Sequence, residues 1–203
     1  GANFVLLGTK DTMVKSVKPL ISICATRTGC GKSQTSRRLI EILMERDLKV
    51  VAIRHPMPYG DLAKQAVQRF ATLDDLKKHK CTIEEIEEYE PHINTGTIVY
   101  AGVDYEAIVR EAEKEADIIL WDGGNNDFPF YKSDLHITVT DPHRAGHGIK
   151  YYPGEVTLKM SDVVIINKID SARPKDVHKL RKVISEVVPG AIVIDAASPI
   201  RVA

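Results

Sequence analysis

The fold of this chain is decided by the stretch LISICATRTGCGKS, residues Leu20–Ser33. An apolar run of strand length, Leu20–Ala25, leads into a glycine-containing loop, and Ser33–Arg46 then carries apolar residues at helical spacing. The loop matches the pattern G-x-x-x-x-G-K-[ST], except that Thr26 stands at the first glycine. A strand, this loop and a helix in that order are the context that a phosphate-binding loop requires, and they predict one here.

The residue types in the loop suit a nucleotide and its metal ion. Glycines allow the backbone conformations in which successive N–H groups form an anion nest, and the helix that follows adds its positive N-terminal end. We expect Lys32 to reach the terminal phosphates as a catalytic cation and the Ser33 hydroxyl to bind Mg²⁺. The predicted nucleotide-binding residues of the loop are Thr28, Gly29, Cys30 through its backbone, Gly31, Lys32, Ser33 and Gln34.

The rest of the chain repeats the alternation of apolar strands and helical patterns. The further predicted strands are Val50–Ile53, Thr97–Ala101, Asp117–Trp121, Leu135–Thr140, Val163–Ile166 and Ala191–Ile194. Asp104 is expected to cap one helix, and Pro174–Val188 to form another. This pattern predicts an α/β protein: a three-layer P-loop NTPase fold with a mostly parallel sheet of about seven strands and helices on both faces.

The middle of the chain has a different pattern. Residues 61–90 are predicted to hold three short helical stretches, two of which begin with capping boxes at Thr72-x-x-Asp75 and Thr82-x-x-Glu85. The acidic run Glu84–Glu88 is interpreted as a solvated helix face.

A second group of residues could hold the metal ion. Asp122 ends a predicted strand downstream of the phosphate-binding loop, which is the arrangement of a Walker B carboxylate that holds Mg²⁺ directly or through water. Asp61 is another candidate Mg²⁺ ligand, and its alternative role is to cap a helix that begins at Leu62. The predicted metal ligands are therefore Ser33, Asp122 and Asp61.

The segment Asn167-Lys-Ile-Asp170 follows a buried strand and has the pattern N-K-x-D. A carboxylate at Asp170 can accept hydrogen bonds from the ring N–H and the exocyclic amine of guanine, while Lys168 lies along the base and Asn167 braces the loop. Adenine lacks that pair of donors and would leave the carboxylate unpaired. The pattern favours GTP, with ATP as the alternative, and places Ala197 for a backbone contact to guanine; the competing interpretation is a solvated turn.

Two more segments at strand ends carry cationic groups, Arg54–Asp61 and Asp141–His147. They are candidates for binding a second, anionic small-molecule substrate, with Arg144 as a candidate catalytic residue. His143 and His147 have metal-like spacing, but the glycines around them argue against a zinc site.

Composition excludes several classes of protein. The chain has 203 residues, and its 28 Lys plus Arg balance 28 Asp plus Glu, so no basic excess points to a nucleic-acid partner. No apolar run approaches the ~20 residues of a membrane span. With no readable signal peptide and only three cysteines, we expect a cytoplasmic protein.

Five motifs together resemble one family: Arg27–Ser33 (RTGCGKS), Arg54–Asp61 (RHPMPYGD), Trp121–Phe130 (WDGGNNDFPF), Asp141–His147 (DPHRAGH) and Asn167–Asp170 (NKID). From about Pro19 to Ile200, the chain resembles the P-loop domain of predicted GTPases related to cyclic 2,3-diphosphoglycerate synthetase. The resemblance implies a fold of the signal-recognition-particle and partitioning-ATPase class. It also implies that residues 19–203 form the nucleotide-binding domain and residues 1–18 a stub or linker from a preceding domain of a longer chain.

The resemblance implies three candidate functions. The first is Mg²⁺-dependent hydrolysis of GTP, coupled to activation of a phosphorylated small acid as in cyclic 2,3-diphosphoglycerate synthesis. The others are an ATP-using synthetase domain and a GTPase switch or metallochaperone of the nickel-insertion type. Arg27 stands at the spacing of the signature Lys of partitioning ATPases, which reaches across a homodimer, so Arg27 could act catalytically in a dimer or be a surface residue.

Overall fold

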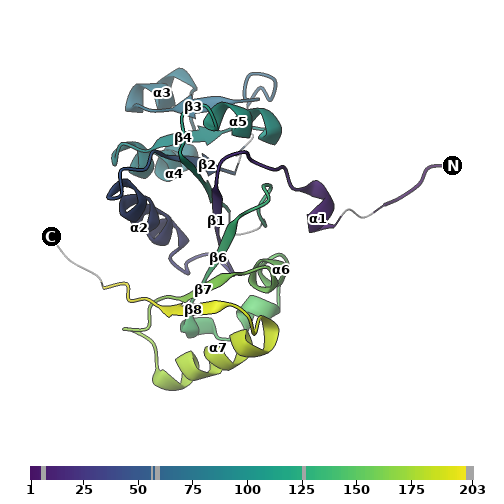
Figure 1. The fold of residues 1–203 in the computed structure, drawn as a ribbon, viewed down its shortest axis with the longest axis vertical. Helices are drawn as coiled ribbons and strands as arrows, with labels where there is room; N and C mark the ends of the chain where they lie inside the picture. Colours follow the sequence, from purple (N-terminus) through teal and green to yellow (C-terminus); the bar gives the residue numbers. More distant parts are fainter. Residues whose placement is uncertain (6–7, 56, 58–59, 125–126, 200–203) are drawn as a thin grey trace.

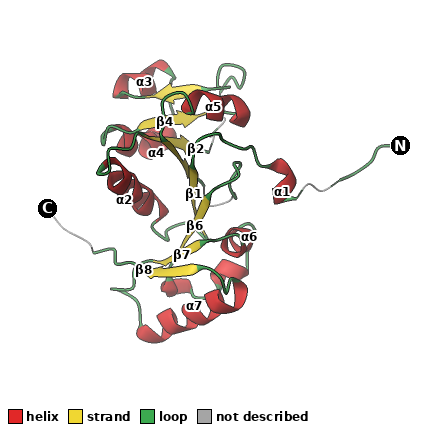
Figure 2. Ribbon diagram, in the orientation of Figure 1, coloured by secondary structure: helices red, strands yellow, loops and turns green. Residues whose placement is uncertain are grey.

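The structure is a computed structural model that describes residues 1–5, 8–55, 57, 60–124 and 127–199. Its centre is one eight-stranded sheet with the order β3-β4-β2-β5-β1-β6-β7-β8, flanked by helices (Figures 1 and 2). The strands are β1 (Leu20–Ala25), β2 (Val50–Arg54), β3 (Gln68–Phe70), β4 (Ile98–Ala101), β5 (Ile118–Asp122), β6 (Leu135–Thr140), β7 (Val163–Ile166) and β8 (Ile192–Asp195). Every neighbouring pair is parallel except β3 and β4, so the predicted fold class is confirmed.

Helices cover both faces of the sheet because alternate strand residues point to opposite sides. In β1, Ile21 and Ile23 pack with residues of α2 and α4, whereas Leu20 and Cys24 pack in the cluster that contains α5. The helices are α1 (Thr9–Thr12), α2 (Lys32–Met44), α3 (Leu73–Lys78), α4 (Ile83–Ile93), α5 (Tyr105–Ala112), α6 (Gly154–Lys159) and α7 (Pro174–Val187), with 3-10 turns at Pro142–Arg144 and His147–Ile149.

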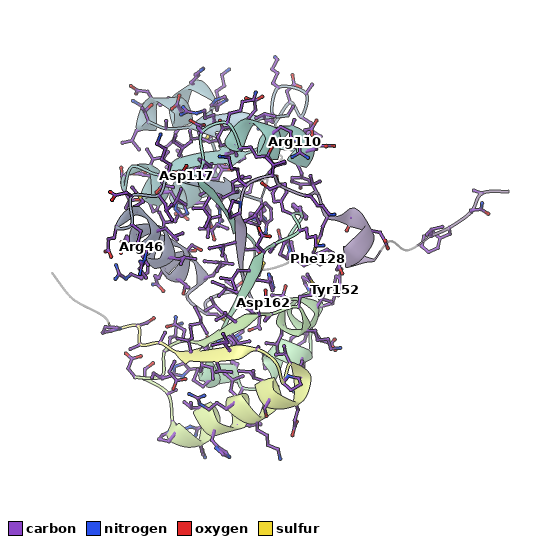
Figure 3. The ribbon with its side chains drawn as sticks, in the orientation of Figure 1. Arg46, Arg110, Asp117, Phe128, Tyr152 and Asp162 are labelled. Carbon is purple, nitrogen blue, oxygen red and sulfur yellow. The ribbon has the colours of Figure 1, made fainter. Side chains whose placement is uncertain are left out.

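Carboxylates fix the register of neighbouring parallel strands at the N-terminal ends of those strands. Asp117, one residue before β5, accepts a hydrogen bond from the backbone N–H of Lys49 (2.9 Å), which precedes β2. Asp162, before β7, accepts from the N–H of His136 in β6 (2.8 Å), and Figure 3 labels both carboxylates. Asp134, before β6, accepts from the N–H of Leu20 (2.8 Å). Each aspartate therefore satisfies a backbone donor of the neighbouring strand.

The segment 61–90 differs from the prediction in its first part. Both capping boxes are present and begin α3 and α4, but residues 62–65 form turns instead of a helix. The carbonyls of Gln65 and Ala66 accept hydrogen bonds from Val103 N (3.0 Å) and Asp104 N (3.1 Å). These carbonyls are therefore hydrogen-bonded to the chain that follows β4. The segment then continues as β3, an antiparallel edge strand that the sequence pattern did not predict.

The beginning of the chain forms few contacts with the sheet. In the predicted stub or linker, Phe4 and Val5 are exposed and lie outside any strand. Val14 pairs with the loop before β6: its N–H donates to Phe130 O (2.9 Å), and its carbonyl accepts from Lys132 N (2.8 Å). The domain boundary at residue 18 stays a prediction. Among the described residues, none of the helices has the length and apolar character that crossing a bilayer requires.

Candidate nucleotide-binding site

The phosphate-binding loop joins β1 to α2 and has the backbone that its glycines allow. Gly29 and Gly31 have φ values of +84° and +98°, and Gly31 occupies the position before the first residue of α2. A Cβ atom on Gly31 would lie 2.1 Å from Asn167 Nδ2. The loop therefore needs glycine at this position both for its left-handed conformation and for the close approach of the N-K-x-D segment.

Hydrogen bonds tie the N-K-x-D segment to the phosphate-binding loop. Asn167 is buried, and its Nδ2 donates to Cys30 O (2.9 Å), while its Oδ1 accepts from Ser198 Oγ (2.9 Å). Lys168 Nζ donates to Gly29 O. Asp170 is exposed, and its Oδ1 accepts from Ser198 N (3.1 Å). Two segments about 140 residues apart in sequence are thus one structural unit.

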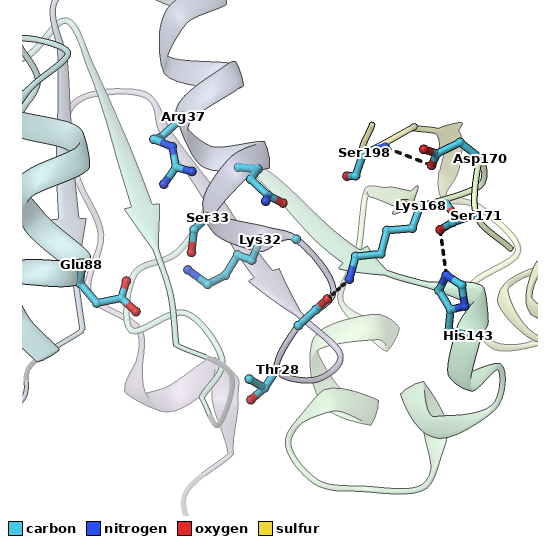
Figure 4. Close-up of a pocket in the computed structure, with 13 residues that line it drawn as sticks. Thr28, Lys32, Ser33, Arg37, Glu88, His143, Lys168, Asp170, Ser171 and Ser198 are labelled. Atoms are coloured by element: carbon cyan, nitrogen blue, oxygen red, sulfur yellow. Dashed lines mark hydrogen bonds between the residues drawn. The ribbon is translucent and has the colours of Figure 1, made fainter. Parts of the chain in front are cut away.

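The loop and the N-K-x-D segment open onto one pocket of about 840 Å³ (Figure 4). Among the predicted residues that line it are Lys32, Ser33 and Asp170. Figure 4 shows Lys168, Asp170 and Ser198 on one side of Lys32 and Ser33, and Arg37 and Glu88 on the other. The complete lining is Thr28, Gly29, Gly31, Lys32, Ser33, Gln34, Arg37, Glu88, His143, Lys168, Asp170, Ser171 and Ser198.

Asp122, at the end of β5, lies beneath the pocket and is fully buried. Its Oδ1 accepts hydrogen bonds from Lys32 Nζ (2.6 Å) and Ser36 Oγ (2.7 Å). Its Oδ2 lies 2.6 Å from Arg54 Nη1 and 3.1 Å from His92 Nε2. A carboxylate offers about four acceptor positions, so these four partners use its whole capacity.

The charges around Asp122 keep it ionised. Burial by itself would raise the pKa of this carboxyl group, but the positive charges of Arg54 and Lys32 outweigh burial and hold the pKa well below its usual value. The carboxylate is therefore a permanent anion at the base of the phosphate-binding loop.

Arg54 is not the loop residue that the sequence predicted. It is the last residue of β2, is 1% exposed, and pairs with Asp122 on one side and Glu88 on the other. Glu88 is correspondingly not a solvated residue of an acidic helix face, because it pairs with Arg54 and lines the pocket. Glu85 is also buried and accepts a hydrogen bond from Thr82 N in the capping box (2.8 Å). The interpretation of Glu84–Glu88 as a solvated helix face is therefore wrong at Glu85, and it is incomplete at Glu88, which is partly exposed but has a buried partner.

Several predicted residues lie away from the pocket or have other partners. Arg27 forms two hydrogen bonds to Asp141 through Nη2 (2.8 and 2.6 Å) and one to Thr28 O through Nη1 (2.8 Å). Arg144 and Ala197 are exposed and are not among the residues that line the pocket. Asp61 is exposed in a turn, where its carboxylate accepts from Ala63 N (3.2 Å).

His143 and His147, which have metal-like spacing in the sequence, contact other residues. His143 Nε2 lies 3.0 Å from Ser171 Oγ, and the His147 ring packs edge-on against Tyr151. No group of three or more potential metal ligands gathers among the residues that the structure describes.

A second acid, Asp127, is partly buried next to this site. The carboxylate of Asp127 is 3.6 Å from His55 Nδ1, and a Cβ atom on Gly124 would come within 2.9 Å of both side chains. Burial raises the pKa of Asp127 to about 6, an effect that the N–H of Gly124 and the charge of Lys32 only partly offset. Burial and the charge of Arg54 lower the pKa of His55 to about 4, so His55 is neutral at pH 7.

Replacing Asp127 with asparagine is expected to raise the free energy of unfolding at pH 8 by about 1–3 kcal/mol. The folded pKa of about 6 exceeds the ordinary value of 3.8, so the wild type loses stability as the pH rises from about 4 past 6, and the neutral amide avoids this loss. Urea denaturation at pH 4 and pH 8 tests this. Equal unfolding free energies of the two proteins at pH 8 would contradict the prediction.

Four residues of the site were not predicted from the sequence. Ser36 and Arg37 lie on α2 one turn after Lys32 and Ser33, and this i, i+4 spacing was the available signal. His92 lies at the end of α4 and carries no local pattern that points to Asp122. Glu88 belongs to an acidic run, and such runs are usually solvated helix faces.

The residues present fit a nucleotide with Mg²⁺. Two glycines in left-handed conformation precede the N-terminus of α2, and Lys32 and Lys168 add positive charge in the same pocket. The oxygen donors Ser33 and Asp122 are of the kind that Mg²⁺ prefers. Because the four partners of Asp122 fill its acceptor positions, one of them must move away before this carboxylate can hold the ion, either directly or through a water molecule that donates to it.

Comparisons with known proteins show similarity in fold and in sequence. The Archaeoglobus fulgidus hydrogenase maturation factor HypB has a similar fold, with a TM-score of 0.59 and 18% identity over 89% of this chain and 81% of that one. A curated protein from Thermococcus kodakarensis, named arginine synthetase ArcE, is 67% identical over 98% of this chain and 45% of its own length. The cyclic 2,3-diphosphoglycerate synthetase of the same organism is 25% identical over 94% of this chain and 48% of its own length.

The chain thus spans less than half the length of these curated relatives. The family described as "Cyclic 2,3-diphosphoglycerate synthetase, P-loop domain" matches residues 94–197, which is just over half of the chain. The chain belongs to this family of P-loop domains.

Proposed function

We propose that this chain is the nucleotide-binding domain of a synthetase, in which Mg²⁺-dependent hydrolysis of GTP, with ATP as the alternative, drives the conversion of a small substrate. The observation that carries the proposal is that Lys32, Lys168 and Asp170 line one pocket. Lys32 belongs to the phosphate end of a nucleotide and Asp170 to the base end, so the pocket offers complementary groups for both.

Within this proposal, Lys32 exchanges its partner when the nucleotide binds. Its ammonium group, which contacts Asp122 (2.6 Å), would turn to the terminal phosphates, and Asp122 would keep Arg54 and His92. Bound Mg²⁺, held by Ser33 and through water by Asp122, would neutralise negative charge on the phosphates. Preorganised positive charge of this kind stabilises the charge that develops during phosphoryl transfer.

The names of the relatives suggest two classes of product. The protein that is 67% identical is named an arginine synthetase, which favours an amino-acid product for the reaction in which this domain takes part. The family name and the more distant relatives favour a cyclic phosphorylated acid instead. The higher identity over nearly the whole chain leads us to propose the amino-acid reaction.

We retain as part of the proposal that Arg27 acts across a homodimer. Its guanidinium is only partly exposed and holds Asp141 in a bidentate pair. Arg27 would therefore have to leave Asp141 in order to reach the phosphates of a partner subunit.

Replacing Asp170 with asparagine tests the choice of nucleotide. The affinity for GTP with Mg²⁺ is expected to fall roughly 10- to 100-fold, because the amide accepts only one of the two guanine hydrogen bonds and sets its own donor against the exocyclic amine. The affinity for ATP should change little. Isothermal titration calorimetry measures both values.

Xanthosine triphosphate provides the matched control. Xanthine has a carbonyl where guanine has the exocyclic amine, so the amide of the Asp170→Asn variant can donate to it, and this nucleotide should bind the variant more tightly than the wild type. Tighter binding of ATP than GTP by the wild type, or unchanged GTP affinity in the variant, would refute the guanine assignment.

A further inference from the structure

The end of the pocket beyond the phosphate-binding loop carries one positive and one negative side chain. Arg37 lies on α2 one helical turn after Ser33, and Glu88 lies on α4 (Figure 4). Both line the pocket on the side of Lys32 and Ser33 that faces away from Asp170. If a nucleotide places its base near Asp170 and its terminal phosphate near Lys32, these two side chains border the space next to the terminal phosphate.

Glu88 is held in place by a buried partner. One of its carboxylate oxygens pairs with Arg54, whose side chain is 1% exposed and also pairs with Asp122. The Glu88 side chain itself is 38% exposed and therefore still faces the pocket. Because Arg54 shares its charge between two carboxylates, Glu88 keeps negative charge to offer to a ligand.

Arg37 is available to a ligand for a different reason. It is half-buried, and within the described part of the chain no ion pair engages it. Its neighbour Arg38, by contrast, is exposed and pairs with Glu41 and Glu45. A guanidinium that lines a pocket without a carboxylate partner is suited to bind a carboxylate in a bidentate manner.

We propose that Arg37 and Glu88 bind the zwitterionic head of an α-amino acid, with Arg37 on its carboxylate and Glu88 on its ammonium group. This inference rests on the proposed function, because it places the second substrate beside the terminal phosphate. A purely anionic substrate such as a phosphorylated acid would meet Arg37 favourably but would be repelled by Glu88. The pair of opposite charges therefore selects amino acids over phosphorylated acids.

Calorimetry on the intact protein tests this assignment with three related ligands. L-Arginine carries both charged groups, agmatine lacks the carboxylate, and N-acetyl-L-arginine lacks the ammonium group. The wild type with Mg²⁺ and a non-hydrolysable GTP analogue is expected to bind L-arginine roughly 10- to 100-fold more tightly than either analogue.

Glu88 and Arg37 should each determine the preference for L-arginine over one of the two analogues. Glu88→Gln should abolish the preference for L-arginine over N-acetyl-L-arginine and leave the preference over agmatine, and Arg37→Gln should do the reverse. The matched control variants, Glu87→Gln and Arg38→Gln, replace exposed neighbours on the same helices and should change neither preference.

Other outcomes would overturn the assignment. Binding of 2,3-diphosphoglycerate in place of L-arginine would do so, and so would a Glu88→Gln variant whose main loss is affinity for Mg²⁺ and nucleotide. Mg²⁺–GTP and L-arginine are also titrated separately, so that failure of the proposed function and failure of this inference can be told apart. If Mg²⁺–GTP does not bind, the proposed function fails; if it binds but Glu88→Gln leaves L-arginine binding unchanged, only this inference fails.

Discussion

Replacing Lys32 with alanine is expected to lower the rate of nucleotide hydrolysis roughly 100- to 1000-fold. Lys32 is the buried cation of the phosphate-binding loop, and its ammonium lies 2.6 Å from Asp122 at the base of the pocket. In the proposed reaction it neutralises charge on the phosphoryl group during transfer, and no flexible cation from solvent can replace it at that position. A phosphate-release assay with saturating Mg²⁺ and GTP measures the loss.

Two further variants separate this effect from unfolding and from a general loss of charge. Lys32→Arg keeps the charge but has a planar guanidinium in a space built for an ammonium group, so it should recover little of the rate. Lys175→Ala removes an exposed lysine at the start of α7 and should leave the rate unchanged. A folded Lys32→Ala protein that hydrolyses GTP within about threefold of the wild type would contradict the role we assign.

Replacing Arg54 with methionine is expected to lower the free energy of unfolding by about 3–5 kcal/mol. Methionine fills much of the same space, but it leaves Oδ2 of the buried Asp122 carboxylate without the guanidinium that lies 2.6 Å away. The backbone carbonyl of Asp122 also loses a donor, since Arg54 Nη1 lies 3.0 Å from it. Guanidinium chloride denaturation at pH 7 measures the change.

The matched control is Arg38→Met on the surface of α2. The Arg38 side chain is 59% exposed, and its ion pairs with Glu41 and Glu45 are solvated, so its loss should change the free energy of unfolding much less than the loss of Arg54 does. Equal effects of the two substitutions would show that the charges around Asp122 contribute no more to stability than a surface ion pair.

Much of the fold follows from local patterns in the sequence. Apolar runs of strand length predicted seven of the eight strands, because strands covered by helices on both faces are rich in apolar residues. The capping boxes at Thr72 and Thr82 were also predicted, since each depends on residues three apart. The turns at residues 62–65 and strand β3 were not, because backbone partners beyond β4 decide their conformation.

The candidate site, like the fold, could be predicted from the sequence only in part. The residue types and spacing of Thr28–Ser33 and Asn167–Asp170 predicted two segments that contribute to one pocket, because each is a short loop at the end of a strand. The arrangement around Asp122 was not predictable in detail, since Lys32, Arg54 and His92 reach it from 90, 68 and 30 residues away.

The sequence by itself determined the strand–loop–helix unit at Leu20–Ser33, the alternation that builds the sheet, and the segments at its carboxyl edge. Only the tertiary structure decided that Arg54 is buried, that Glu88 lines the pocket, and that Arg37 has no ion-pair partner within the described residues. The physical reason is that a charged residue's role depends on which charges lie within a few ångströms of it. Packing of elements far apart in the chain sets those distances, and no local pattern records them.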